Sequence, residues 1–215
     1  MKINSILIGK GSGSAGNVTV VQLKGQSILK QKATIVSNPR SSGQISQRNM
    51  VTRAVYAWQQ FGSVLKQGFT SLLPHSSQYN TYVSVNAEHF KGKTFTKETF
   101  RIADMLDSVA SKGSLGELQM DQAVINGDNL EISLNKNSLQ GIAKAGDKIV
   151  CLANWEHRDT ANYAEIEVTI AMLASANPVA NFDLNLGAPS GDLISAFFLV
   201  SEDGRKSTTS QWFYS

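Results

Sequence analysis

The 215-residue sequence has a single cysteine, Cys151, and only three histidines, His75, His89 and His157. One cysteine cannot form an intrachain disulfide, and it excludes a zinc site built from several cysteines. The histidines lack the short spacing that places several ligands around one metal ion. We therefore expect neither a bound metal nor another cofactor.

Long hydrophobic runs are also missing. No apolar segment approaches the roughly 18 residues of a membrane-spanning helix. The apolar run at residues 6–8 is too short for a secretory signal, which needs about 7–15 apolar residues. We expect a protein that does not enter a membrane and that stays in the cytoplasm, or in a particle assembled there.

Acidic residues are almost absent from the first half of the chain. Residues 1–101 contain thirteen Lys or Arg but only Glu88 and Glu98, which gives a formal charge of +11. Residues 102–215 contain seven basic and fifteen acidic residues, a charge of −8. This break predicts a basic domain over residues 1–110 and an acidic domain over 111–215. The two halves can neutralise each other, or the basic half can bind an external polyanion.

The start of the chain carries strand signals. We expect a strand at residues 3–8 and a linker rich in glycine and serine at 9–17. A β-hairpin should follow, formed by 18–23 and 26–30, because its β-branched runs flank the Lys24-Gly25 turn.

Helical patterns come next. Ser41 or Ser42 suits an N-cap, and apolar residues then recur every three or four positions until Gly68. A second, weaker helix is expected at about 77–90. The stretch 96–111 is compatible with either helix or strand.

The second half of the chain has a different sequence pattern, in which short runs of strand-forming residues are separated by turn-forming residues. These runs are 118–125, 130–134, 148–153, 164–173, 182–186, 193–200 and 211–214. Seven strands in about 100 residues predict an immunoglobulin-like or fibronectin-like sandwich, and the missing disulfide favours the fibronectin-like variety. The predicted fold class is therefore α+β, with an N-terminal hairpin and helices followed by an all-β sandwich.

Catalytic patterns are few. Residues 11–16 match G-x-G-x-x-G, but a strand-forming run at 18–21 follows where a dinucleotide site needs a helix. Cys151 lies in an apolar strand and is expected to be a buried thiol. No set of residues supplies nucleophile, base and orienting group together, so we expect a protein that is not an enzyme.

Two groups of residues are candidates for contacts with a partner or a polyanion. The basic group lies on or beside the hairpin and on the first helix: Lys24, Lys30, Lys32, Arg40, Arg48 and Arg53. The aromatic group, Trp212, Phe213 and Tyr214, ends the last strand. It either completes the core or anchors an interface.

Several short motifs are spread over most of the chain: 9–17, 38–39, 44–48, 68–69, 77–80, 111–115 and 198–207. With these motifs the chain resembles a family of uncharacterised proteins from Bacteroidetes-type bacteria and their crAss-like phages. The resemblance implies a helical N-terminal part and a C-terminal immunoglobulin-like sandwich. It implies no activity, and it departs from this chain at the aromatic end, 211–214.

These observations lead to two functional hypotheses. The first is a structural or assembly protein, a phage virion component of the portal, tail or capsid. It would form homo-oligomers and bind other virion proteins, in a particle that is assembled in the bacterial cytoplasm. The second is a nucleic-acid-binding protein that holds phosphates through residues 1–101.

Overall fold

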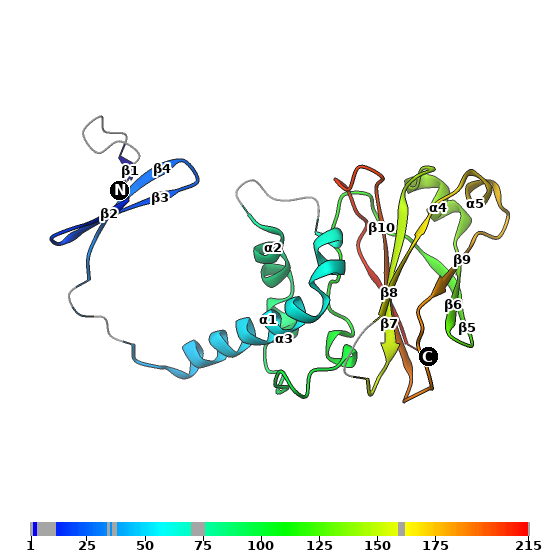
Figure 1. The fold of residues 1–215 in the computed structure, drawn as a ribbon, viewed down its shortest axis with the longest axis horizontal. Coiled ribbons are helices and arrows are strands. Elements are labelled where there is room, and N and C mark those ends of the chain that lie inside the picture. Colours follow the sequence, from blue (N-terminus) through cyan, green and yellow to red (C-terminus); the bar gives the residue numbers. More distant parts are fainter. Residues whose placement is uncertain are drawn as a thin grey trace. The chain divides into compact units, whose positions relative to one another are not determined.

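The computed structural model describes residues 2–3, 12–33, 35, 38–69, 76–158 and 162–214. The chain forms two compact units, Met1–Ser42 and Gly43–Ser215 (Figure 1). The first unit contains a small sheet, and the second combines helices with two further sheets.

The first unit is a four-stranded antiparallel sheet in the order β1-β4-β3-β2. Its strands are β1 (Lys2–Ile3), β2 (Gly13–Ala15), β3 (Val18–Leu23) and β4 (Gln26–Gln31). Lys24 and Gly25 join β3 to β4 with φ values of 48° and 77°. Two positive φ values are what a two-residue type I′ turn requires, so the predicted hairpin is confirmed. Of the strand expected at 3–8, only Ile3 lies within the described residues.

Helix α1 (Ser42–Gly68) begins and ends where the sequence predicts. Its first two turns, residues 42–49, contain no buried side chain. Further along, the buried positions recur every three or four residues: Met50, Ala54, Ala57, Phe61, Val64, Leu65 and Gly68. This spacing gives the helix one core-facing side.

The expected second helix is split in two, α2 (Gln78–Val85) and α3 (Ala87–Phe90). Asn86 separates them, and its buried side chain explains the break. Its Oδ1 accepts the backbone N–H of Val109 at 2.7 Å, and its Nδ2 donates to the carbonyl oxygen of Val109 at 2.9 Å. The ambiguous stretch 96–111 is irregular around one short 3₁₀ helix, η1 (Ile102–Met105).

In the described part of the second unit, seven strands form two antiparallel sheets, ordered β11-β10-β7-β8 and β5-β6-β9. The strands are β5 (Met120–Asn126), β6 (Asn129–Leu134), β7 (Lys148–Trp155), β8 (Asn162–Glu167), β9 (Val179–Asp183), β10 (Leu193–Val200) and β11 (Gln211–Tyr214). Lettered A, B, C, C′, E, F and G in chain order, the sheets are A-B-E and G-F-C-C′. The predicted sandwich is confirmed, and so is the α+β class.

The sandwich is not purely β. Helix α4 (Lys136–Ile142) follows β6, and helix α5 (Ile170–Ala174) occupies part of the run 164–173 that we expected to be one strand. Thr169 ends that strand pattern, because its hydroxyl accepts the backbone N–H of Met172 at 3.2 Å and caps α5.

Strands β7 and β10 are buried on both faces, so the second unit has three layers (Figure 1). One face of the sheet packs against α1, α2 and α3, and the other packs against the second sheet. Side chains alternate between the two cores. Val150, Leu152, Ile194, Ala196 and Phe198 face the helices, whereas Ile149, Cys151, Ala153, Phe197 and Leu199 lie in the sandwich core.

The structure divides the chain at a different place from the charge break. The charges predict domains 1–110 and 111–215, whereas the two compact units meet between Ser42 and Gly43. The helices and the sandwich share one apolar core, which joins them into a single unit. Surface charge carries no information on that shared core.

Candidate functional site

The sheet of the first unit presents three of the predicted basic residues. Lys24, Lys30 and Lys32 are all exposed. Lys24 lies in the turn, whereas Lys30 and Lys32 lie at the opposite end of the hairpin, about 20 Å away at roughly 3.3 Å per residue. The backbone N–H of Lys32 donates to the carbonyl oxygen of Asn17 at 2.7 Å. We call residues 12–33 the basic sheet.

Among the described residues, the basic sheet shows no buried core. None of the side chains described between residues 12 and 42 is buried. The strand register nevertheless groups apolar residues: Val21 lies opposite Ile28, and Leu23 and Lys30 share that face. Val21 is 38% and Leu23 is 56% exposed. A small sheet of this kind is marginally stable in water unless a hydrophobic face is packed against something.

Charge distinguishes this part of the chain further. Residues 1–42 contain six basic residues and not one Asp or Glu. The face that carries Val21, Leu23 and Lys30 is therefore both apolar and positive. Such a face suits a partner that offers apolar contacts together with negative charge.

The other predicted basic residues lie outside the basic sheet. Arg40 is exposed and has a φ of 47°, just before α1. Arg48 and Arg53 lie on α1 in the second unit. Arg53 lines an open cavity of about 220 Å³ together with Asn49, Thr52, Tyr56, Thr94, Phe95 and Thr96.

The aromatic residues of β11 have three different environments. Trp212 packs against the core beneath the helices, and its indole N–H donates to the carbonyl oxygen of Ser108. Phe213 is half-buried and pairs with Ser195 of β10. Tyr214 is 51% exposed, and a hydrogen bond with Asp192 raises the pKa of its hydroxyl. Trp212 therefore has the core role that the sequence allowed, and Tyr214 keeps an exposed ring.

A surface that the sequence analysis missed lies on the outer side of the β5-β6-β9 sheet. The strands carry Asp121, Glu131 and Asp183 and no Lys or Arg. Leu130, Ile132 and Phe182 point into the sandwich core, so the alternate residues form the outer side. We call this surface the acidic face, and its residues are Gln122, Val124, Asn126, Asn129, Glu131, Ser133, Val179, Asn181 and Asp183.

The acidic face also offers an apolar contact. Val124 is 44% exposed and lies directly opposite Glu131 in the register. Glu131 in turn lies opposite Asn181, and Asn129 lies opposite Asp183. The strand register brings these residues together, which explains why no linear motif reveals them.

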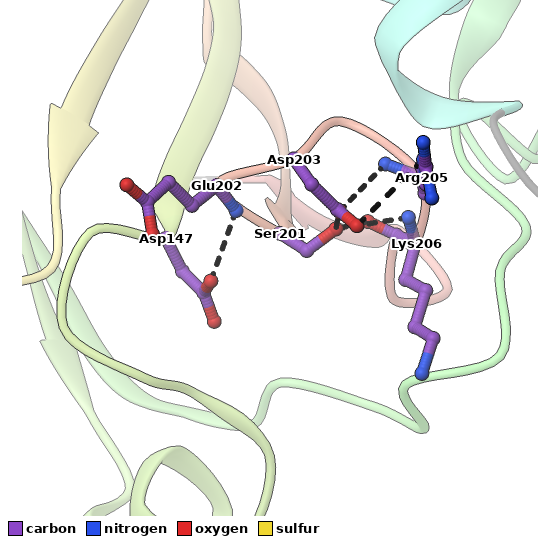
Figure 2. A network of polar contacts seen from close by, with 6 residues as sticks. All are labelled: Asp147, Ser201, Glu202, Asp203, Arg205 and Lys206. Carbon is purple, nitrogen blue, oxygen red and sulfur yellow. Dashed lines mark hydrogen bonds and ion pairs between the residues drawn. The ribbon is translucent and has the colours of Figure 1, made fainter.

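At one end of the sandwich the connections that follow β6, β8 and β10 are tied together. Gln140 of α4 donates to the carbonyl oxygen of Leu173 in α5 at 2.7 Å. The carboxylate of Asp147, which is only 5% exposed, accepts the N–H of Glu202 at 3.0 Å (Figure 2). It also accepts the N–H of Lys144 at 2.8 Å. Asp147 thus fixes the β6–β7 connection to the β10–β11 turn.

The β10–β11 turn contains most of the motif 198–207. The hydroxyl of Ser201 donates to Asp203 at 2.6 Å and accepts the N–H of Lys206 at 2.9 Å (Figure 2). Asp203 also accepts the N–H of Arg205, and these bonds, that of Ser201 foremost, lower the pKa of its carboxyl group. A cavity of about 250 Å³ lies beside the turn. These hydrogen bonds give Ser201 and Asp203 a structural role, which is to hold the turn.

Side chains with metal-binding chemistry are not clustered in the part of the chain that the structure describes. There, no three His, Cys, Asp or Glu side chains are arranged to hold a metal ion. Cys151 is fully buried, as expected, and burial raises the pKa of its thiol. Among the described residues, no helix combines the length and the apolar character that crossing a bilayer requires.

Comparison with known proteins gives one match. A family model, described as a family of unknown function (DUF6266), matches residues 10–214. Neither the comparison with curated proteins nor the comparison with solved structures found a match.

Proposed function

Since the chain belongs to this family of unknown function, we propose that it is a structural or assembly protein that works through protein–protein contacts, not through catalysis. One observation supports this most directly. The basic sheet is a β unit in which no described side chain is buried, although Val21, Leu23 and Ile28 lie on one face. A protein partner that covers this face would bury these apolar side chains and so stabilise the sheet.

The specific setting in this proposal is a phage particle assembled in the bacterial cytoplasm. The chain would be a virion component of the portal, tail or capsid surface, in contact with its own copies and with other virion proteins. The resemblance to proteins of Bacteroidetes-type bacteria and their crAss-like phages supports this setting. The sandwich supports it as well, because immunoglobulin-like sandwiches often serve as adhesive modules on surfaces.

The test is the mass of the purified full-length protein in solution, measured at low and at high salt. We expect an oligomer at low salt that weakens at high salt, because part of its contact is between exposed charges that salt screens. Reversing Lys24, Lys30 and Lys32 to Glu should abolish it. A wild-type protein that stays monomeric at every salt concentration contradicts self-assembly.

One observation favours a second candidate, a nucleic-acid-binding protein. The first 42 residues hold six basic residues and no acid, a composition that suits phosphate contacts. In that case a monomer should shift in mass only when duplex DNA is added. Its affinity should fall steeply with salt, by about 0.9 log units per phosphate contact for each tenfold rise in salt concentration.

A further inference from the structure

We infer that the basic sheet of one copy docks on the acidic face of a second copy. This inference rests on the proposed function and specifies both surfaces of the contact. The partner of the basic sheet is then the outer side of the β5-β6-β9 sheet of another chain.

Charge complementarity selects this partner surface. The basic sheet carries Lys24, Lys30 and Lys32, and residues 1–42 contain no acid. Strands β5, β6 and β9 carry three acids and no base, and two of these acids, Glu131 and Asp183, belong to the acidic face. Each surface thus has a single sign, so bringing them together creates attraction with no like-charge contact between these strands.

The apolar contacts also match in position. On the basic sheet, Val21 and Ile28 lie beside Lys30 on one face. On the acidic face, Val124 lies directly opposite Glu131. Two sheet faces of this kind can pack against each other at a separation of about 10 Å. Such packing buries Val21, Leu23 and Val124, the three apolar side chains that are most exposed on these two surfaces.

The connection between the units argues for a second copy as the partner. Within the second unit the acidic face and the helices lie on opposite sides of the sandwich, about 20 Å apart for layers spaced by roughly 10 Å. The start of α1 points away from the sandwich (Figure 1), and its first two turns add about 12 Å.

The linker is short for docking on the same chain. Eight residues, 34–41, separate the basic sheet from α1, and eight extended residues span at most about 28 Å. This span is shorter than the roughly 32 Å that the layer spacing and the exposed turns of α1 together place between the start of that helix and the acidic face. The same linker places no restriction on docking to a neighbouring molecule.

A contact of this kind joins two different surfaces, so it is heterologous. Each copy then offers one basic sheet and one acidic face, and successive copies add head to tail. Such a contact closes into a ring or continues as a filament, depending on the rotation between neighbours.

A charge swap on the full-length chain tests the inference. The first variant carries Lys24→Glu, Lys30→Glu and Lys32→Glu, and the second carries Glu131→Lys and Asp183→Lys. We expect either variant alone to weaken self-association at least about 100-fold, because like charges then face each other. A third variant with all five substitutions should assemble again, since the two surfaces are complementary with their signs exchanged.

Matched controls carry the same number of charge reversals at other positions, all of them in the second unit. The basic control is Lys91→Glu, Lys97→Glu and Lys112→Glu, and the acidic control is Glu88→Lys and Glu98→Lys. All five residues are exposed. Oligomers should persist in both controls. Far-UV circular dichroism and thermal unfolding establish that each variant is folded, and Glu131→Gln with Asp183→Asn replaces the reversal if it is not.

The outcomes separate the inference from the proposed function. If the lysine variant dissociates while the Glu131 and Asp183 variant stays oligomeric, the acidic face is not the partner, and assembly through the basic sheet stands. Failure of the five-substitution variant to assemble, with both single-surface variants monomeric and folded, also overturns the pairing of these surfaces. A wild-type protein that is monomeric throughout overturns the proposed self-assembly itself.

Discussion

The carbonyl oxygen of Gly68 accepts a hydrogen bond of 2.7 Å from the hydroxyl of Ser207, 139 residues further along the chain. The same oxygen also accepts the hydroxyl of Ser111 at 2.9 Å and the N–H of Lys112 at 3.1 Å. The end of α1 is thereby bonded directly to the sandwich. This junction, with the shared core, explains why the helices and the sandwich form one unit.

Removal of the Ser207 hydroxyl should weaken this junction. Ser207 is fully buried, so Ser207→Ala leaves the Gly68 carbonyl with one donor fewer in a place that water does not reach. We expect the free energy of unfolding to fall by about 1–2 kcal/mol. Urea denaturation of the full-length protein measures the change, and an unaltered midpoint would contradict this role for the hydroxyl.

Ser195 should behave in the opposite way. The hydroxyl of Ser195 is buried and has no hydrogen-bond partner among the described residues. Ser195 lies in β10 between apolar neighbours. An unpaired buried hydroxyl costs about 1–3 kcal/mol, so Ser195→Ala should leave stability unchanged or raise it by about 1 kcal/mol. A clear loss in the same urea experiment would show that the hydroxyl is bonded after all.

Two glycines offer a matched comparison. A Cβ atom at Gly113 would overlap the carbonyl oxygen of Ser207, whereas a Cβ atom at Gly141 would meet nothing within 4 Å. Gly113→Ala should therefore destabilise the protein by several kcal/mol or prevent folding. Gly141→Ala, inside α4, should stabilise it by about 0.5–1 kcal/mol. Thermal unfolding distinguishes the two, and equal shifts would refute the close approach at Gly113.

Two aromatic residues of β11, Trp212 and Tyr214, should differ in how much they contribute to stability. Trp212→Ala removes packing beneath the helices and the hydrogen bond to Ser108, so we expect a loss of about 2 kcal/mol or more. Tyr214→Ala removes a ring that is half exposed and should change stability by about 0.5 kcal/mol or less. If Tyr214→Ala leaves the monomer's stability intact but weakens oligomers, the tyrosine belongs to an interface.

His89 should make stability depend on pH. Its Nε2 donates to the carbonyl oxygen of Asp104 at 2.7 Å. Burial lowers the pKa of the imidazole below 6.5, and the positive charge of Lys93 lowers it further. This hydrogen bond and the negative charges of Asp104 and Asp107 raise the pKa by less, so the net shift is downward. The folded state thus favours the neutral ring. The contribution of His89 is complete above pH 6.5 and is lost as the pH falls through the lowered pKa.

The measurement is the free energy of unfolding at pH 7 and at pH 5. His89→Gln should reduce the difference between these two values relative to the wild type. His157→Gln, which replaces an exposed imidazole, serves as the matched substitution. Equal pH dependence in the wild type and His89→Gln would contradict the burial of a neutral ring.

Much of the fold is visible in local sequence patterns. The Lys24-Gly25 turn, the limits of α1 and the seven strands of the sandwich follow from turn chemistry and from apolar periodicity, which act over a few residues. The prediction of one strand over residues 164–173 is wrong at its end, because a helix cap there outweighs the apolar periodicity. Thr169 turns the end of an expected strand into α5, because a single hydroxyl–amide hydrogen bond favours a helix there.

The candidate site could be predicted only in part. The basic residues of the hairpin are apparent from composition, since no acid precedes Glu88. The acidic face is not apparent, because Val124, Glu131 and Asp183 come from three strands and meet only through the register. The buried carboxylate of Asp147 is likewise invisible in the sequence, since its partner Glu202 is 55 residues away.

The sequence by itself thus determined the hairpin, the limits of α1, most of the sandwich strands and the separation of the charges along the chain. The tertiary structure alone decided that the helices share a core with β7 and β10 and that the compact units divide at Ser42. The physical reason lies in the range of the interactions. Turns, caps and periodicity are set by neighbours in the chain, whereas the contact of Gly68 with Ser207 depends on which buried faces pack together.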